Sequence, residues 1–454
     1  MIKSRLNLYF IVFLMVFNFC SASTSGAALV ELRGKIIPQS GGLPATVILR
    51  SYEDEGYMPT VVINKDSTFS IKVYLFHSGL YTIRVMRASV DVMLSTAEPV
   101  TSVTITLDGG AALREYHVEN SLENDAYAAF KTAYNLYDSK LISHFRFCEG
   151  KDSCESDLHQ MLTDYARDLS LIEKKFKGTY VTNILCPMKM PLVAKNIKNT
   201  TDEFRKGYFE KVDFSDSSIF STPILKDMMA YYIVYFMDAA LISKEKEFLT
   251  YITAKFKSSP LMLHKGSSFI LEDIIGGQRE KMLLMFIDWY NSGDNKAAIN
   301  NPVLDAKVQG ISRVLPGMPY INLSGADADS VSHSLKDIVD RSKCTLLLFW
   351  SSECSHCRDE MPHVKEYYEK YHSKGFDIYA MSFDNDPEKW KRFITENGLS
   401  WTNVRVNRNA NPNPVMDYVA TSTPALILID SKGTILHRFM PKSKLEDHIV
   451  EALK

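Results

Sequence analysis

The chain has 454 residues, of which 46% are hydrophobic, 11% aromatic and 23% charged, and this composition excludes intrinsic disorder as the dominant state. Its 52 basic and 54 acidic side chains give a formal net charge of -2 at pH 7. No basic excess is present to neutralise phosphates, so we expect no nucleic-acid partner. At roughly 150 residues per domain, the length predicts about three domains.

Residues 1–22 have the pattern of a secretory signal peptide. Two basic residues precede an apolar run over 6–19, and small residues follow it. The run is shorter than the ~20 residues that a membrane-spanning helix needs. We expect cleavage after Ala22 and export to the periplasm or cell envelope. A lipid anchor on Cys20 is the alternative, but bulky Phe19 stands where lipoprotein signals usually carry a small residue.

Residues 28–113 predict a β-rich domain. Apolar and polar residues alternate with period two over 69–75 and 103–107, and turn clusters such as Gly41-Gly42 separate the runs. Short alternating strands between turns indicate a small antiparallel sheet or a β-sandwich. No catalytic combination of side chains stands out, so we interpret this domain as a binding or scaffold module.

Residues 116–300 predict an α-helical domain, because apolar residues recur there at helical spacing. The later helices are expected over 225–242, 245–256, 269–275 and 279–290, with prolines such as Pro260 between them. We interpret the many aromatic and methionine side chains as packing residues and not as a cofactor site.

Cys148 and Cys154 flank a short polar segment of the helical region. In an oxidising compartment this spacing predicts a structural disulfide. Together with His144 the two cysteines would also offer three metal ligands. No fourth ligand follows at a recognisable spacing, so we expect no metal and no cofactor.

The chemistry is predicted in the last third of the chain. The apolar run Cys344–Trp350 is typical of a strand buried in a parallel or mixed sheet. Cys354 and Cys357 follow it as a CxxC motif at the start of a helical pattern. A helix N-terminus stabilises a thiolate, so Cys354 is the expected nucleophile, and Cys357 is placed to resolve a mixed disulfide. A plain bridge or half of a zinc site is the alternative, but the sequence offers no second ligand pair.

With these motifs, residues 305–454 resemble the thioredoxin superfamily. Trp350 and Pro362 stand where that family carries the aromatic residue before the dithiol and the helix-kinking proline after it. Thr423-Pro424 is similar to the loop whose cis-proline faces the dithiol. The resemblance implies a C-terminal α/β thioredoxin-like fold, with Thr423 presenting backbone groups to a substrate.

The interval from Cys354 to Pro424 is 424 - 354 = 70 residues, longer than in plain thioredoxin. It resembles the exported TlpA/ResA-type thiol–disulfide oxidoreductases, and Leu315–Leu323 is similar to their opening hairpin. The upstream arrangement resembles multidomain thioredoxin-like proteins of Bacteroidota. We therefore expect a multidomain chain with a β-sandwich-like domain, an α-helical domain and a redox domain.

Glu360 stands where ResA-type members carry a glutamate, three residues after Cys357. Residues at i and i+3 share one helix face, so a carboxyl group at Glu360 is placed to take and return the proton of Cys357. The alternative is an exposed acid in the first turns of a helix. Leu348 occupies the position of the buried aspartate of plain thioredoxin.

The active-site residues do not match a thiol peroxidase or a vestigial redox domain. A thiol peroxidase needs Thr or Ser at a fixed distance before its cysteine, and Leu347 stands seven residues before Cys354. A binding or scaffold protein with a vestigial redox domain would carry a degraded site, whereas the CxxC motif and Pro424 are intact.

Two residues beside the dithiol point to opposite directions of electron flow. Glu360 favours a reductase of specific envelope disulfides that draws electrons from a membrane thiol reductant. His356 is typical of strongly oxidising sites, and Glu353 opposes its effect on Cys354. We expect a potential between about -270 and -120 mV, and we predict a reductase, with a disulfide oxidase or isomerase as the alternative.

Two further cysteines, Cys186 and Cys344, are expected to be buried and inert because each lies in an apolar context. The expected partners are protein disulfide substrates and the membrane donor. The sequence contains no feature that predicts an oligomeric state.

Overall fold

The computed structural model describes residues 26–39, 41–53, 58–109, 112–148, 152–235, 242–257, 259–276, 279–406, 417–420, 422–438 and 444–454. The predicted signal peptide and Cys20 lie outside these residues. The chain forms two compact units, Met1–Phe236 and Met237–Lys454. Their boundary falls inside the region predicted as one helical domain. Among the helices that the structure describes, none combines the length and the apolar character needed to cross a membrane.

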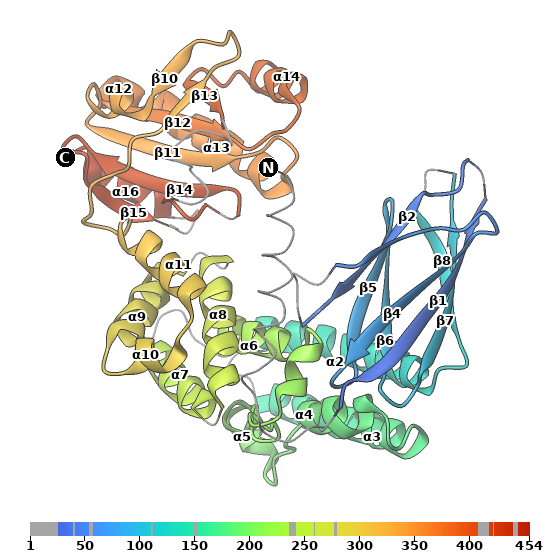
Figure 1. Cartoon of the computed structure of the whole chain (residues 1–454). Helices are drawn as coiled ribbons and strands as arrows, with labels where there is room; N and C mark the ends of the chain where they lie inside the picture. Colours follow the sequence, from blue (N-terminus) through green and yellow to red (C-terminus); the bar gives the residue numbers. More distant parts are fainter. Residues whose placement is uncertain are drawn as a thin grey trace, which may run out of the picture. The chain divides into compact units, whose positions relative to one another are not determined.

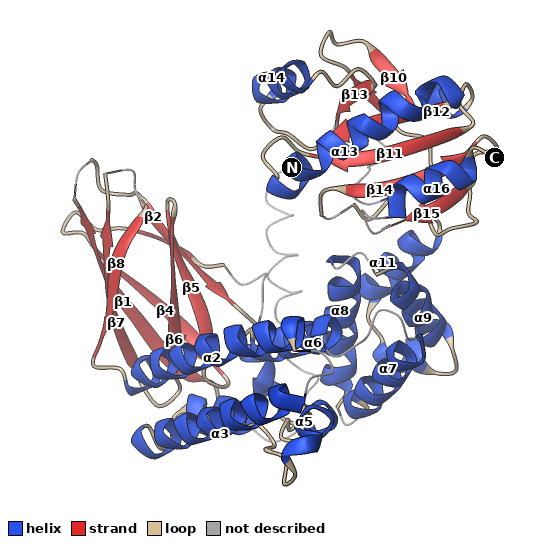
Figure 2. Cartoon of the chain, turned by 180° about the vertical axis from the view of Figure 1, so that it is seen from behind, coloured by secondary structure: helices blue, strands red, loops and turns tan. Residues whose placement is uncertain are grey.

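The first unit begins with two four-stranded sheets (Figure 2). Their strands are β1 (Ala28–Pro38), β2 (Thr46–Ser51), β3 (Thr60–Val62), β4 (Thr68–Leu75), β5 (Gly79–Val85), β6 (Ala88–Leu94), β7 (Val100–Leu107) and β8 (Leu113–Glu119). The orders are β4-β1-β7-β8 and β3-β2-β5-β6. Every second residue of β4 is buried, and the buried faces of both sheets form one core. The β-sandwich prediction is confirmed, although β1 and β7 pair in parallel.

Helices complete the first unit. They are α2 (Leu122–Phe147), α3 (Asp152–Lys175), α4 (Cys186–Lys189), α5 (Thr200–Gly207) and α6 (Ile224–Tyr235), with the π-helical segment η2 (Val181–Leu185) and the short 3-10 helices η3 (Ile197–Asn199) and η4 (Ser217–Ser221). Ser121 caps α2 by accepting a hydrogen bond from the backbone N–H of Asn124 at 3.1 Å. Buried Glu123 accepts hydrogen bonds from Ser95 of the sandwich and from the backbone of Tyr180, so it joins the sheets to the helices.

The second unit opens with further helices. They are α7 (Ile242–Phe256), α8 (Pro260–Gly276), α9 (Glu280–Asn291), α10 (Asn295–Ile299) and α11 (Pro302–Ser312). The predicted start of α8 at residue 269 was wrong. The helix begins at Pro260, because the fixed φ of proline suits the first turn, where its missing N–H costs nothing.

A seven-stranded mixed sheet forms the rest of the second unit (Figure 1). Its strands are β9 (Ser324–Ala326), β10 (Ser332–Ser334), β11 (Cys344–Trp350), β12 (Phe376–Ser382), β13 (Thr402–Arg405), β14 (Ala425–Asp430) and β15 (Ile435–Arg438). The helices are α12 (Leu335–Val339), α13 (Ser355–Tyr371), α14 (Pro387–Asn397) and α16 (Leu445–Ala452), with turn η5 (His372–Lys374).

The sheet order is β10-β9-β13-β12-β11-β14-β15, which places β11 between a parallel and an antiparallel neighbour. Side chains of α13, α14 and α16 pack on one face of β11, and those of α12 pack on the other. The opening hairpin consists of β9 and β10 and not of Leu315–Leu323, which forms turns and a single bridge from Pro319 to Thr434. Pro316 and Pro319 lack the N–H groups that a strand ladder needs.

Candidate active site

The junction of β11 and α13 places the CxxC motif. All residues of β11 are buried, and α13 begins at Ser355 after a short loop. Cys354 is the N-cap residue of α13, with φ -83° and ψ 118°. Its Sγ accepts a hydrogen bond from the backbone N–H of Cys357 at 3.4 Å. The nucleophile predicted from the sequence therefore lies where backbone N–H groups and the helix dipole favour a negative charge.

The two thiols, which are not joined by a disulfide in this structure, differ strongly in their environment. Cys357 is 1% exposed, whereas Cys354 is only partly buried. Burial raises the pKa of Cys357 to about 12. Burial also acts to raise the pKa of Cys354, but hydrogen bonds from Thr423, Cys357 and the His356 backbone stabilise its thiolate, and the net pKa is below the ordinary value. Cys354 is thus the thiol that ionises more readily.

The loop before β14 brings Thr423 and Pro424 to the dithiol. The Thr423–Pro424 peptide bond is cis, the conformation that the resemblance implies. When protonated, the Cys354 thiol donates a hydrogen bond to the carbonyl oxygen of Thr423 at 3.2 Å. Pro424 is buried and Thr423 is partly exposed. The backbone of Thr423 therefore lies beside the nucleophilic sulfur, although almost 70 residues separate them in sequence.

Asp384 is a site residue that the sequence analysis missed. Its carboxylate is 5% exposed and accepts hydrogen bonds from Ser351 Oγ at 3.0 Å, Ser352 N–H at 2.9 Å and Ser382 Oγ at 2.6 Å. It therefore fixes the loop directly before Cys354. Asp384 follows β12, which runs parallel to β11, so both loops leave the same edge of the sheet. An acid just beyond a second buried strand is the signal that would have revealed it.

The acidic side chain next to the nucleophile is paired. Glu353 forms an ion pair with Lys389 of α14 at 2.6 Å, and both side chains are about half exposed or more. The guanidinium of Arg358 donates to the carbonyl oxygen of Ser352 at 3.1 Å. The negative charge expected to oppose the Cys354 thiolate is thus partly compensated from another element.

Glu360 lies on the buried face of α13. It is 2% exposed, on the same helix face as Cys357 and Val364. This burial excludes the alternative of a solvent-exposed acid in the first turns of a helix.

The remaining support residues differ in exposure. Trp350 is fully buried, with its ring centroid 5.4 Å from that of Phe393. His356 and Pro362 are exposed, and Pro362 lies inside α13.

The other cysteines are not part of this site. Cys186 and Cys344 are fully buried, and burial raises the pKa of each thiol to about 12. Cys148 and Cys154 form a disulfide with Cα atoms 5.7 Å apart. Both of their sulfurs are therefore engaged and do not act with His144 as metal ligands in this structure.

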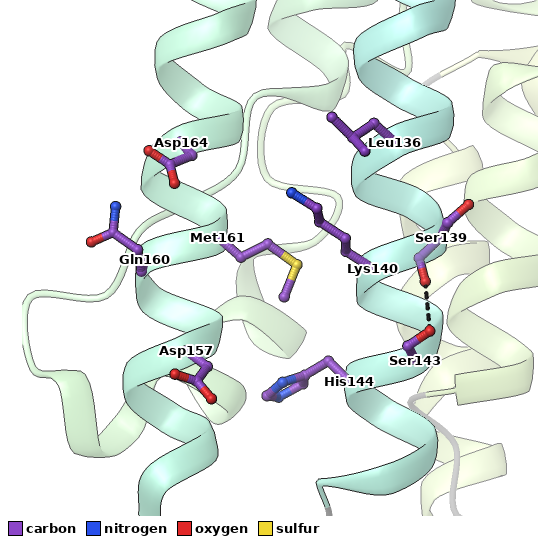
Figure 3. Close-up of a pocket in the computed structure, with 9 residues that line it drawn as sticks. All are labelled: Leu136, Ser139, Lys140, Ser143, His144, Asp157, Gln160, Met161 and Asp164. Carbon is purple, nitrogen blue, oxygen red and sulfur yellow. Dashed lines mark hydrogen bonds between the residues drawn. The ribbon is translucent and has the colours of Figure 1, made fainter.

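A groove lies between α2 and α3 (Figure 3). Its volume is about 690 Å³, and it is lined by Leu136, Ser139, Lys140, Ser143, His144, Asp157, Gln160, Met161 and Asp164. His144 extends into it from α2 and Met161 from α3. The lining residues carry a positive charge on α2 and negative charges on α3. No nucleophile among them lies beside a general base, so we do not interpret the groove as a catalytic site.

Ser221, His77 and Glu53 also lie together in the first unit. Ser221 Oγ is 2.9 Å from His77 Nδ1, and Glu53 Oε2 is 3.2 Å from both Ser221 Oγ and His77 Nε2. In a catalytic triad the carboxylate contacts the histidine and not the serine. Here one oxygen of Glu53 contacts both Ser221 and His77. The cluster therefore connects η4 to the sandwich and does not activate the serine.

Comparison with known proteins assigns a family to the region that contains the CxxC site. A family model described as thioredoxin-like matches residues 342–435. Thiol-disulfide oxidoreductase ResA of Bacillus thuringiensis (strain Al Hakam) is 28% identical over 148 residues, covering 32% of this chain and 80% of the relative. ResA of Halalkalibacterium halodurans is 32% identical over 122 residues, covering 26% of this chain and 65% of the relative.

Among solved structures, the thioredoxin domain of a thiol-disulfide oxidoreductase from Bacteroides vulgatus is similar at 29% identity, with a TM-score of 0.29, over 31% of this chain and 98% of that domain. The family match lies in the C-terminal third of the chain, which also contains the dithiol. The C-terminal part of the chain is a thioredoxin-like thiol–disulfide oxidoreductase domain, related to the ResA/TlpA-type enzymes.

Proposed function

We propose that the chain reduces specific protein disulfides outside the cytoplasm, with Cys354 as the nucleophile and Cys357 as the resolving thiol. The observation that carries this proposal is the asymmetry of the dithiol. The pKa of partly exposed Cys354 is lowered, whereas that of buried Cys357 is raised to about 12. A reductase needs this division, because the thiolate that attacks must be exposed and the second thiol must wait for the mixed disulfide.

The proposed reaction has two exchanges. The Cys354 thiolate attacks one sulfur of a substrate disulfide, forms a mixed disulfide and releases the other substrate sulfur as a thiolate that takes up a proton. Cys357 then loses its proton and attacks Cys354 Sγ, which releases the second substrate thiol. The substrate gains two electrons and two protons, and the chain is left with a Cys354–Cys357 disulfide.

Glu360 is the proposed proton acceptor for Cys357. A thiol with a pKa of about 12 needs a base at the moment of attack. Glu360 is buried on the same helix face, where its carboxylate is shielded from water. The same carboxyl group returns the proton when the dithiol is regenerated.

Substrate binding is proposed at the Thr423–Pro424 loop. The carbonyl oxygen of Thr423 lies 3.2 Å from Cys354 Sγ, so a peptide that pairs with Thr423 as an added strand brings its disulfide to the nucleophile. Trp350, His356 and Pro362 are proposed as support residues that shape the start of α13 around this reaction.

Export and regeneration belong to the same proposal. The pattern at residues 1–22 supports a signal peptide, and a membrane thiol reductant is the proposed electron donor. The β-rich region 28–113 and the helical region 116–300 are proposed to bind partners, and residues 305–454 are proposed to carry the catalytic domain.

Trapping of mixed disulfides tests the assignment of the two thiols. Cys357→Ser should accumulate mixed disulfides on Cys354 when the chain is mixed with oxidised substrate, because the resolving step is blocked. Cys354→Ser, the matched control, should accumulate none. Non-reducing gels and mass mapping report the result, and trapping by Cys354→Ser alone would reverse the assignment.

The alternative is a disulfide oxidase or isomerase, and His356 is the residue that favours it, since a cation beside Cys354 stabilises the reduced form. Equilibration with glutathione measures the potential, which we expect between about -270 and -120 mV. A value near -120 mV, together with failure to accept electrons from a membrane reductant, would replace the reductase by the oxidase.

A further inference from the structure

A second group of chemically active side chains lies on the edge of the redox domain, on elements that carry no part of the CxxC site. His437 belongs to β15, and His448 and Glu451 belong to α16. Each offers one ligand atom, and these atoms all lie within 4.8 Å of one another. Two imidazoles and a carboxylate are the donor set of three-ligand Zn²⁺ sites.

A β-bulge aims His437 at α16. In the pairing of β14 with β15, Leu428 lies opposite His437 and Ile429 lies opposite Ile435, so Leu436 is an extra residue. In a regular strand, alternation would place His437 on the sheet face of Ile435, two residues before it. At the bulge, His437 instead shares the face of Leu428, which belongs to the core that also contains Ile449 of α16. Bulges commonly re-aim a side chain in this way.

The other two ligands share one face of α16. His448 and Glu451 stand three residues apart, a spacing that places both side chains on the same side of a helix. Buried Leu445 and Ile449 fix the rotation of α16 on the sheet. The strand and the helix thus hold the three side chains together through packing that does not involve the ligands themselves.

The two histidine rings are unusually close. Their centroids lie 3.7 Å apart at an interplanar angle of 31°. His448 Nδ1 is buried and has no hydrogen-bond partner among the residues that the structure describes. A buried polar atom in this state costs free energy that a ligand would recover.

We propose that His437, His448 and Glu451 bind a divalent transition-metal ion of the Zn²⁺ class, with water completing the coordination. Bonds of about 2.0–2.2 Å in a tetrahedral site place ligand atoms roughly 3.3 Å apart, so small side-chain rotations close the group around an ion. Glu451 is exposed and the histidines are partly buried, which leaves the ion a path from solvent.

The ion would act as a brace. It joins the edge strand β15 to α16, the last helix of the chain, across the segment that connects them. Since the ligands belong to elements other than α13, the brace stabilises the domain and takes no part in thiol exchange. This inference is independent of whether the chain works as a reductase or as an oxidase.

Calorimetric titration of the whole chain with Zn²⁺ tests the proposal. The Cys354–Cys357 dithiol is first oxidised, because thiolates also bind zinc. We expect one ion per chain and a higher melting temperature with zinc. His437→Gln and His448→Gln should each weaken binding at least about tenfold. His363→Gln is the matched control, since His363 is an exposed histidine of the same domain, and it should leave the affinity unchanged.

Glu451→Gln removes the exposed ligand without touching the core, so it protects the test against misfolding of the histidine variants. We expect weaker zinc binding in this variant and an unaltered melting temperature in the absence of zinc. Absence of binding by the oxidised chain would overturn the proposal. So would a zinc affinity that is the same in the original chain, in both histidine variants and in Glu451→Gln.

Discussion

Two pairs of cysteines lie at helix ends in this chain, and their surroundings direct them to different chemistry. Cys148 follows the last residue of α2, Cys154 lies in the first turn of α3, and a disulfide joins them. Cys354 and Cys357 both belong to the start of α13 and are free thiols. The C-terminal end of a helix carries partial negative charge and the N-terminal end partial positive charge.

The difference shows what makes a cysteine pair reactive. Cys148 gains no stabilisation as a thiolate at the end of α2, and Cys154 is 7% exposed. Cys354 receives N–H groups of α13 and remains accessible. The spacing of two cysteines in the sequence is therefore a weaker guide to thiol–disulfide exchange than their structural position. The reactive pair lies at a helix N-terminus, with one sulfur exposed and the other buried.

Alkylation against pH tests the asymmetry of the reactive pair and has the largest expected effect. Because the pKa of Cys354 is lowered and that of Cys357 is about 12, Cys354 should react with iodoacetamide more than about 10³-fold faster at pH 7. As pH rises, the midpoint of the Cys354 rate profile should lie below that of an ordinary thiol, because the pKa of Cys354 is lowered. Mass mapping of the labelled sites provides the measurement, and comparable labelling of both thiols would contradict it.

Glu360→Gln tests a second difference between the two cysteine pairs. It removes the buried acid that lies on the same helix face as Cys357. Glutamine preserves the packing, but it cannot accept the proton of Cys357, so release of a mixed disulfide should slow on the order of 10²-fold. Stopped-flow measurement of this step across pH provides the readout. Glu366→Gln, an exposed acid on the same helix, is the control. Equal effects of the two substitutions would assign the change to helix charge.

Cys148→Ala with Cys154→Ala breaks the structural pair. The disulfide closes a loop with a sequence separation of 6 residues, so its removal should lower the free energy of unfolding by about 2 kcal/mol. Urea unfolding measures this loss. Insulin reduction should remain at the original rate, and a loss of activity in the folded variant would show that the pair takes part in exchange.

Asp384→Asn loosens the loop before Cys354 and leaves the dithiol in place. The amide presents N–H groups to donors from Ser351 and Ser352, so we expect a loss of about 1–2 kcal/mol in stability and roughly tenfold in exchange rate. Urea unfolding and insulin reduction report the two effects. Asp359→Asn, which alters an exposed acid of α13, should change neither.

Lys389→Ala has the smallest expected effect. It leaves the negative charge of Glu353 uncompensated beside Cys354, so the pKa of that thiol should rise, and only slightly because the ion pair is exposed to solvent. The pH dependence of alkylation measures the shift. Arg392→Ala removes the same charge from the same helix and should give a smaller change. A downward shift in Lys389→Ala would contradict the proposed role of the pair.

The sequence predicted the parts of the redox domain that depend on local order. The apolar run of β11, the CxxC motif and the helix after it are contiguous, so their geometry follows from short-range rules. The thioredoxin-like fold of residues 342–435 and the β-sandwich are confirmed. The loop at Pro424 was predicted only through resemblance to a family, because a cis bond has no local signal of its own.

Contacts between residues that are far apart in the sequence were not predicted. Asp384 reaches Ser352 only because β12 lies beside β11, and Lys389 reaches Glu353 across 36 residues. The bulge at Leu436 leaves no mark in the alternation of a four-residue strand. In each case the partner is set by sheet order and register, which a single sequence does not encode in any local pattern.

Because Cys354 is also the residue that caps α13, folding and redox state form one thermodynamic cycle. The helix terminus stabilises the Cys354 thiolate of the reduced chain, and the oxidised chain has no thiolate to stabilise. A difference of about 1.4 kcal/mol between the free energies of unfolding of the two forms corresponds to a shift of 30 mV in the potential of a two-electron couple. Melting curves of the reduced and oxidised chains therefore measure how far folding shifts the potential of the dithiol. The two curves thus give the contribution of the folded helix terminus to the oxidising strength of the dithiol, in a measurement that needs no partner.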